Sequence, residues 1–255
     1  MIKLKSKQDI ELLKIAGKHL GSILSELVKL VGLGVRTTDL DHQARELLKN
    51  CGDESSFLNY TPSGSKLAYP AALCVSINEE IVHGIPNKRL IKAGDVVTID
   101  LGLKHQNKYF VDAARTILVP PVDPAVKKLS EAARLGLAAG LQAAKIGNTI
   151  GDIGAAVQVY AERGGFGIIR DLSGHGVGFA VHEEPYVPNY GQKGKGEKLK
   201  VGMVLAIEPM FTLGGEKTKL LSDGFTFSTK DQSLAVHWED TVAITEDGPI
   251  ILTQK

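Results

Sequence analysis

The segment GDVVTID, residues 94–100, has a counterpart in GMVLAIE, residues 202–208. Each begins with glycine, continues through a stretch rich in strand-forming residues, and ends at a carboxylate, Asp100 or Glu208. A second pair, GVRTTD at 34–39 and GNTIGD at 147–152, runs from glycine to aspartate and is separated by nearly the same offset. A repeat of this size predicts two pseudo-symmetric α/β halves with the functional site between them.

The predicted elements of the first half are two helices followed by a group of strands. Apolar residues at helical spacing follow Ser6, and a second helix starts at a Thr38 cap and ends at Gly52. A polar loop over 53–70 comes next. Three strand-like segments complete this half, at 72–77, 94–103 and 108–119.

The second half repeats this order. Its predicted helices cover 126–145 and 152–164. Its strand-like segments lie at 202–211, 224–229 and 234–245. The repeat therefore spans about residues 12–119 and 125–245 of one predicted domain, 1–255.

Composition excludes several functional classes. Thirty basic and 29 acidic residues give a net charge of +1, which provides no overall field for nucleic acid or anionic lipid. No apolar run reaches membrane-spanning length, and the basic N-terminus lacks the apolar core of a signal peptide. Cys51 and Cys74 form no CxxC pair. We therefore expect a soluble, reduced, cytoplasmic protein.

Carboxylates recur on the predicted inner strands of both halves. Alternation along residues 96–101 places Asp100 on the face opposite Ile99 and Leu101, and a hairpin returns Asp112 beside it. Glu208 repeats the position of Asp100, and Glu239 lies on a strand similar to that of Asp112.

Buried together, these four acids would repel one another strongly, and only one cation, Arg115, lies near these strand positions. Each acid taken alone is more often a surface or edge residue. The symmetric set instead favours a divalent-metal site of the two-metal hydrolytic type.

Two histidines flank the segment VGFAV in SGHGVGFAVHEEP, residues 173–185. His175 lies between two glycines, which let the backbone approach closely, and it is suited to be the nitrogen ligand. His182 lies seven residues later and is better placed as a donor to the substrate. A lone histidine is usually structural, but the surrounding acids favour a functional role here.

Six segments in this order resemble type I methionine aminopeptidases of the bacterial type. They are INEEIVHGIP, VTIDLGL, FVDAART, SGHGVG with HEEPYVPNYG, LKVGMVLAIEPM and HWEDTVAIT. The resemblance covers nearly the whole chain, and the ordered set is far more specific than GHGxG alone. It implies the pita-bread fold, an α/β (α+β) architecture of two pseudo-twofold-related halves with a central antiparallel sheet.

The resemblance also implies residue roles. The five metal ligands would be Asp100, Asp112, His175, Glu208 and Glu239. Asp112 and Glu239 would bridge two divalent ions. Asp100 would complete the coordination of one ion, and His175 with Glu208 would complete that of the other. The ions would be Co, Mn, Fe or Zn, and the mostly oxygen ligand set suits Mn²⁺, Fe²⁺ or Co²⁺ better than a structural zinc.

The implied reaction is removal of the N-terminal methionine from nascent proteins and peptides, with a preference for a small second residue. Glu208 would act as general base and then general acid, and His182 would stabilise the oxyanion. His83 and His182 would contact the substrate, and Tyr69, Cys74 and Phe225 would line the methionine pocket.

Two departures from the family pattern concern this pocket. Residue 181 is Val where many relatives carry a larger side chain, and the loop over 58–68 is longer than usual. Both features bear on the shape of the pocket and leave the metal ligands unaffected.

The fold also allows two other interpretations. Xaa-Pro aminopeptidases and prolidases share the fold, but they normally carry a large N-terminal domain, and VHGIP favours the methionine enzymes. A non-enzymatic binding module of this fold predicts a gap among the seven acid and histidine positions, and none is missing. The expected partners are N-termini of nascent polypeptides and the ribosome surface, without specific nucleic-acid or membrane binding, and the expected state is a monomer.

Overall fold

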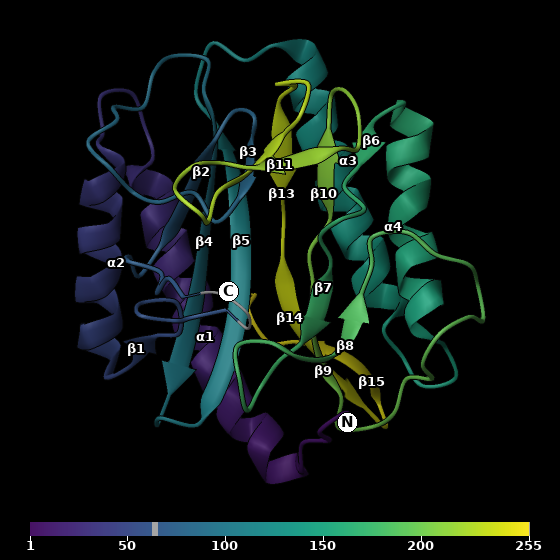
Figure 1. The fold of residues 1–255 in the computed structure, drawn as a ribbon. Helices are drawn as coiled ribbons and strands as arrows, with labels where there is room; N and C mark the ends of the chain where they lie inside the picture. Colours follow the sequence, from purple (N-terminus) through teal and green to yellow (C-terminus); the bar gives the residue numbers. More distant parts are fainter. Residues whose placement is uncertain (63–65, 255) are drawn as a thin grey trace.

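The computed structural model describes residues 1–62 and 66–254, and in each half of the chain two helices precede a group of strands (Figure 1). The first half contains α1 (Lys7–Leu30), α2 (Thr37–Cys51), β1 (Glu54–Ser55), β2 (Cys74–Ile77), β3 (Glu80–Val82), β4 (Val96–His105) and β5 (Tyr109–Leu118). The second half begins with α3 (Pro124–Ala143) and α4 (Ile150–Gly164). Its strands are β6 (Gly167–Ile168), β7 (Gly174–Gly176), β8 (Glu183–Val187), β9 (Val204–Ile207), β10 (Met210–Thr212), β11 (Thr218–Leu220), β12 (Phe227–Thr229), β13 (Ala235–His237), β14 (Asp240–Thr245) and β15 (Gly248–Ile251).

Antiparallel sheets from the two halves meet in the middle of the molecule. One sheet has the order β1-β4-β2 with β5 paired to β4, and another has the order β15-β14-β9-β7-β8. Ala114 of β5 and Glu239 exchange two backbone hydrogen bonds, of 3.3 and 3.1 Å, which join the halves. The helices lie outside, with α1 and α2 on one flank and α3 and α4 on the other (Figure 1). No described helix is both long enough and apolar enough to span a bilayer.

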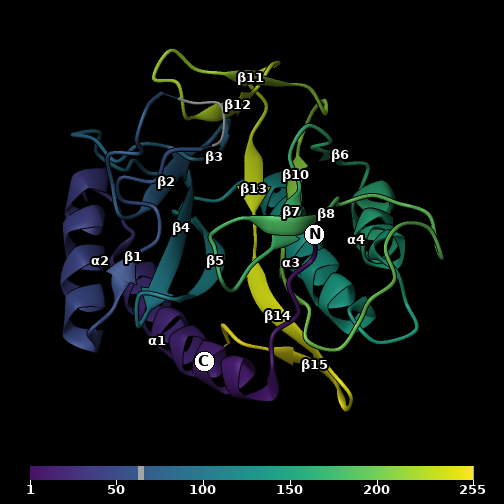
Figure 2. The same cartoon turned by 60° about the horizontal axis from the view of Figure 1, so that its bottom comes forward.

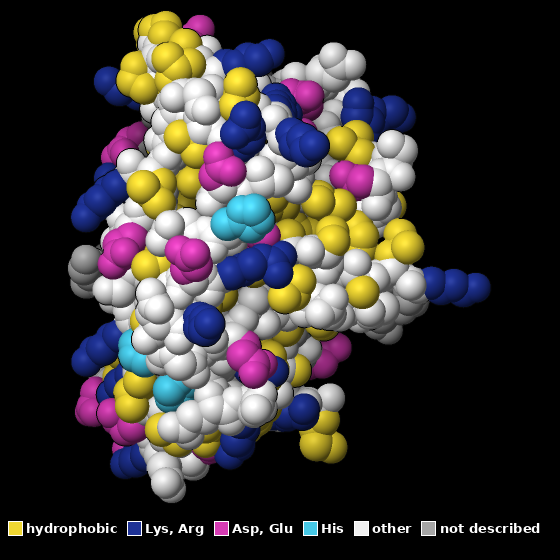
Figure 3. All heavy atoms as spheres, turned by 90° about the vertical axis from the view of Figure 1, so that its left-hand side faces the viewer, with side chains coloured by type: hydrophobic (Ala, Val, Ile, Leu, Met, Phe, Trp, Pro, Cys, Tyr) yellow, Lys and Arg dark blue, Asp and Glu magenta, His cyan; other side chains and the backbone are white. Residues whose placement is uncertain are grey.

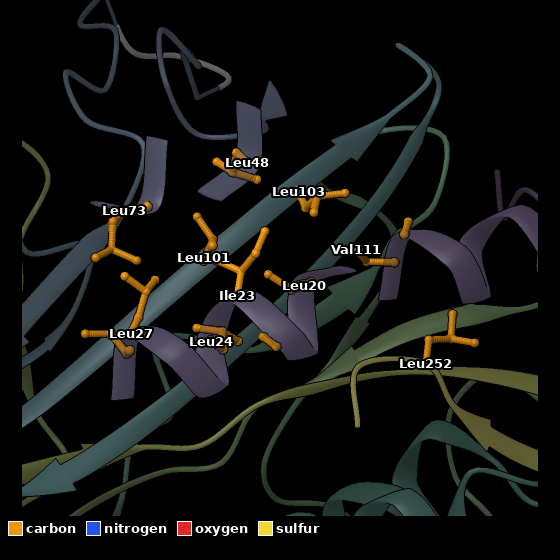
Figure 4. Packing of buried hydrophobic residues seen from close by; sticks show 14 of the residues in the cluster. Leu20, Ile23, Leu24, Leu27, Leu48, Leu73, Leu101, Leu103, Val111 and Leu252 are labelled. Carbon is orange, nitrogen blue, oxygen red and sulfur yellow. The ribbon is translucent and has the colours of Figure 1, made fainter. Parts of the chain in front are cut away.

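Helix α1 begins at a capping box and buries its apolar stripe against β4 and β5. Ser6 accepts a hydrogen bond from the backbone N–H of Asp9, and the Asp9 side chain accepts one from the backbone N–H of Ser6. Leu20, Leu24 and their helix neighbours pack on Leu101 and other apolar residues of these strands (Figure 4). Each such buried side chain contributes about 1.5–3 kcal/mol. The alternation predicted for β4 is confirmed, since its odd-numbered residues form this core and leave Asp100 on the other face.

The structure corrects several predicted boundaries. Thr38 does not cap α2, which begins at Thr37 after Arg36 and has no side-chain cap. The Thr37 hydroxyl instead donates to the Asn87 carbonyl at 2.9 Å, so it is used to hold a neighbouring loop. Helix α4 begins before the predicted residue 152, because Thr149 and Asp152 form a capping box.

The strand-like segments 202–211 and 234–245 are each interrupted. Residues 208–209 separate β9 from β10, and residues 238–239 separate β13 from β14. Glu208 and Glu239 therefore lie in strand breaks, whereas their counterparts Asp100 and Asp112 lie within continuous strands. Pro209 follows Glu208 and has no N–H to continue the ladder, which explains the first break. The short strand β3 was not predicted.

The C-terminal residues run along α1 (Figure 2), and this approach requires glycines in the helix. A Cβ at Gly17 would collide with the Leu252 carbonyl, and one at Gly21 would meet the Thr253 carbonyl at 2.7 Å.

We expect Gly17→Ala to lower the free energy of unfolding by about 1–3 kcal/mol, even though alanine favours helix formation, because backbone atoms must shift. Urea denaturation monitored by circular dichroism measures this. Gly32→Ala is the matched control, because a Cβ there meets nothing within 4 Å. Equal unfolding midpoints for the two variants would contradict the packing described here.

Candidate metal centre

Four acidic side chains and one histidine reach a common cavity from both halves. Asp100 of β4 pairs with Ala114, and Asp112 of β5 pairs with Gly102, so the two aspartates lie diagonally on one face of the sheet. Glu208 and Glu239 enter from the strand breaks of the second half. Each half of the chain thus supplies two of the four acids.

His175 occupies the centre of β7, between Gly174 and Gly176. A Cβ on either glycine would collide with a carbonyl of a neighbouring strand, Ala206 on one side and Glu184 on the other. The predicted reason for these glycines, close approach of the backbone, is confirmed.

Ligand atoms of Asp112, His175 and Glu239 all lie within 4.8 Å of one another. Nε2 of His175 lies 3.7 Å from Oε1 of Glu208. A cavity of about 130 Å³ is lined by these residues and by every other residue predicted for the site, namely Asp100, His83, His182, Tyr69, Cys74 and Phe225. The structure therefore brings all ten predicted residues to one place.

The carboxylates are buried without cationic side-chain partners. Oδ1 of Asp100, Oδ1 of Asp112 and Oε1 of Glu239 accept no hydrogen bond. Arg115, the nearby cation, points elsewhere and pairs with Asp240 at 2.7 Å. Among the described residues, no lysine or arginine pairs with any of the four acids of the site.

Burial and mutual repulsion raise the pKa values of these acids. Burial raises the pKa of Asp100 to about 6, with a further contribution from Glu208. Burial and the neighbouring carboxylates raise the pKa of Asp112 and that of Glu239 well above the ordinary range. Unpaired oxygens that face a shared space with one imidazole fit divalent cations.

His83 and His175 are neutral at physiological pH. Burial lowers the pKa of His175 to about 3 and that of His83 to about 4. Nδ1 of His175 donates to the Gly176 carbonyl at 2.9 Å, which leaves the Nε2 lone pair directed toward the acids. The rings of His175 and His182 meet edge to face, 4.4 Å apart.

The segment that carries His182 is held by a buried ion pair. Nζ of Lys5 lies 2.6 Å from Oε2 of Glu183, and both side chains are almost fully buried. Oε1 of Glu183 accepts the backbone N–H groups of Phe179 and Ala180, at 2.6 and 2.9 Å. These contacts fix the backbone on both sides of His182.

Comparison with known proteins agrees with this geometry. The chain matches the family described as metallopeptidase family M24 over residues 11–246. It is 43% identical to the methionine aminopeptidase of Clostridium acetobutylicum over 254 residues, which cover 99% of each chain. It is 44% identical to that of Aquifex aeolicus over 256 residues, again covering 99% of each chain.

The chain belongs to metallopeptidase family M24. The solved methionine aminopeptidase of Thermotoga maritima matches it with a TM-score of 0.94 and 39% identity over the full length of both chains. The prolidase of Pyrococcus furiosus matches with a TM-score of 0.76 and 24% identity, and 65% of that chain is covered, so it shows the fold alone. The pita-bread fold and metal-dependent methionine aminopeptidase chemistry are confirmed.

His237 contacts two acids of the site, and sequence reasoning missed it. Its Nε2 lies 3.4 Å from Oε2 of Glu208 and 3.8 Å from Oε2 of Glu239. The sequence HWE could have indicated His237, because His237 precedes Glu239 by two residues and residues two apart on a predicted strand share a face. Tyr60 was also missed, and its hydroxyl lies 2.9 Å from Nδ1 of His182.

Val181 and part of the loop over 58–68 lie beside the apolar wall of the cavity, which Tyr60 and Pro62 of that loop line. Val181 packs in one buried cluster with Tyr69, Cys74 and Phe225. The Tyr69 hydroxyl donates to the Gly84 carbonyl at 2.9 Å, and its ring meets Phe225 edge to face at 5.3 Å. Of the predicted long loop over 58–68, residues 63–65 lie outside the described residues.

We expect Mn²⁺ binding to release protons between pH 6 and 7. The raised pKa values of Asp100, Asp112 and Glu239 mean that the metal-free protein holds protons that a cation must displace, so affinity increases as pH rises. Titration calorimetry in buffers of different ionisation enthalpy measures this release. Glu239→Gln should release fewer protons, and an apparent enthalpy that does not depend on the buffer would contradict the prediction.

Proposed function

We propose that this chain removes the N-terminal methionine from nascent proteins and peptides, favouring a small second residue. The observation that carries the proposal is the group of unpaired, buried carboxylate oxygens beside an apolar pocket in one cavity. Full-length similarity to methionine aminopeptidases supports the substrate assignment.

Two divalent ions are proposed to occupy the site, with five protein ligands. Asp112 and Glu239 would hold the ions from the two halves of the chain, which are joined beside them by the hydrogen bonds between Ala114 and Glu239. Asp100, His175 and Glu208 would supply the remaining protein ligands. The oxygen-rich set is compatible with Mn²⁺, Fe²⁺, Co²⁺ or Zn²⁺ and favours the first three.

The bound ions supply Lewis acidity, which polarises the scissile carbonyl and lowers the pKa of the attacking water. Glu208 is proposed to take the proton from that water and to pass it to the leaving amine. Burial raises the pKa of Glu208, which suits a carboxylate that must hold a proton between these steps.

His182 is proposed to donate from Nε2 to the oxyanion that forms at the scissile carbon. Donation from the Tyr60 hydroxyl to Nδ1 would keep the proton on Nε2, and burial lowers the pKa of His182 so that the ring stays neutral. His83 lines the same cavity and is proposed to hold the substrate near the scissile bond.

The apolar cluster that includes Tyr69, Cys74, Val181 and Phe225 is the proposed pocket for the methionine side chain. An unbranched thioether fits an irregular apolar cavity of this kind. The free α-amino group would lie by Asp100, which restricts the enzyme to chain ends. A second hollow of about 470 Å³, lined by His83, His182 and the exposed Tyr186, adjoins the site and offers space for the following residues.

Residues 1–255 are proposed to act as one catalytic domain, monomeric and cytoplasmic. The proposed partners are N-termini of nascent chains and, as a consequence of acting on nascent chains, the ribosome surface. Failure to co-sediment with ribosomes at low salt would count against the ribosome contact.

The function is tested with chelator-stripped protein, the peptides Met-Ala-Ser and Ala-Pro-Ala, and added Mn²⁺ or Co²⁺. Mass spectrometry should show metal-dependent loss of methionine from the first peptide and no cleavage of the second. Cleavage before proline would contradict the proposed specificity.

Two alanine variants separate the proposed histidine roles. His182→Ala should lower kcat about 10²–10³-fold while Mn²⁺ still binds, because only an oxyanion donor is lost. His175→Ala should weaken Mn²⁺ binding itself. His42→Ala, on the exposed face of α2, is the matched control and should change neither. Loss of Mn²⁺ binding in His182→Ala with full binding in His175→Ala would reverse the assignment.

A further inference from the structure

A second group of potential ligands lies away from the catalytic cavity. His19 comes from α1, Asp53 follows α2, and His105 is the last residue of β4. His105 lies five positions after Asp100, so strand alternation directs it to the opposite face of the sheet, beneath α1. None of the three lines the catalytic cavity.

The three side chains form a compact cluster centred on the carboxylate. Oδ2 of Asp53 lies 2.6 Å from Nδ1 of His19, and Oδ1 lies 2.6 Å from Nδ1 of His105. The two imidazole rings are 5.8 Å apart and nearly perpendicular. Each residue offers one ligand atom, and these atoms all lie within 4.8 Å of one another.

The Asp53 carboxylate is fully buried and has no lysine or arginine partner among the described residues. Its side chain is 0% exposed, and its ion-pair contacts are to the two histidines alone. The nearby Lys104 pairs with Glu54 instead. A buried carboxylate needs a compensating positive charge, which a divalent cation would supply.

A second observation is that the polar groups of the cluster are incompletely satisfied. Nε2 of His105 is buried and has no hydrogen-bond partner, and it lies across the ring from Nδ1, the atom that faces Asp53. A buried polar nitrogen without a partner is costly, so the cluster is not a fully satisfied hydrogen-bonded network. His19, whose side chain is 34% exposed, opens the cluster to solvent on the flank formed by α1 and α2, where histidines reach the surface (Figure 3).

We propose that His19, Asp53 and His105 bind one divalent transition-metal ion of the zinc type, separately from the catalytic ions. Two imidazoles and one carboxylate are typical ligands of Zn²⁺, Ni²⁺ or Cu²⁺, whereas Ca²⁺ and Mg²⁺ prefer all-oxygen sites. Water supplies the remaining positions.

Only a small adjustment is needed to admit the ion. Tetrahedral ligands of zinc lie about 3.3 Å apart, so the 2.6 Å contacts must open by less than about 1 Å. The partly exposed His19 on the surface of α1 can make this movement. The bound ion would connect three elements that are distant in sequence, and it should therefore raise the melting temperature.

The test compares zinc content in matched variants. The wild-type protein, the variant His19→Ala and the control His42→Ala are each equilibrated with Zn²⁺ at pH 7.5. Gel filtration then removes excess ion, and mass spectrometry measures the bound zinc. We expect His19→Ala to hold one equivalent less than His42→Ala and wild type. Because the result is a difference, it does not depend on how many ions the catalytic centre holds, nor on whether the proposed function is correct.

Thermal unfolding supplies an independent readout. Zinc at about 100 times its dissociation constant should raise the melting temperature by about 5 °C more in His42→Ala than in His19→Ala. His105→Gln, which keeps a side chain of similar size, serves as a second variant should His19→Ala fold poorly, as judged by circular dichroism. Equal zinc content in the variants and the control would overturn the proposal and show that the cluster is a hydrogen-bonded clamp alone.

Discussion

The rest of the structure depends on one electrostatic constraint, the burial of four carboxylates in a single cavity. Asp100, Asp112, Glu208 and Glu239 lie close together, and no described lysine or arginine compensates them. Burial raises the pKa of each acid, and the neighbouring carboxylates raise the pKa values of Asp100, Asp112 and Glu239 further, so the metal-free site keeps its negative charge low by retaining protons. Cations are the natural substitute for those protons, and this exchange links metal binding to pH.

The architecture follows from bringing these acids together. Each half contributes two of them, and the hydrogen bonds between Ala114 and Glu239 hold the two sets in register. The opposite face of β4 is apolar and is covered by α1, which leaves the polar face free for the site. Glycines at 174 and 176 then allow the strand carrying His175 to approach its neighbours closely. Packing on one side of the sheet therefore supports chemistry on the other.

Much of this could be predicted because it is encoded locally or by repetition. Strand alternation placed Asp100 on the correct face, and the repeated GDVVTID and GMVLAIE segments identified Glu208 as its counterpart. The predicted Thr38 cap of α2 is wrong because the helix begins one residue earlier, at Thr37. The Thr37 hydroxyl donates to the carbonyl of the distant Asn87, and such a contact has no local signature in the sequence. The strand breaks at Glu208 and Glu239 were missed because the apolar pattern continues across them.

Residues that act through tertiary contacts were the hardest to predict. The Tyr60 contact with His182 and the cluster of His19, Asp53 and His105 join positions that are far apart along the chain. No spacing rule relates such positions, so only the folded structure could show them.

Crystallography with Mn²⁺, using anomalous data collected near the manganese absorption edge, would show whether the buried carboxylates hold two ions. Two peaks are expected in the cavity, about 3.5–4 Å apart, both in contact with Asp112 and Glu239. A single peak, or peaks that do not contact both of these acids, would contradict this expectation.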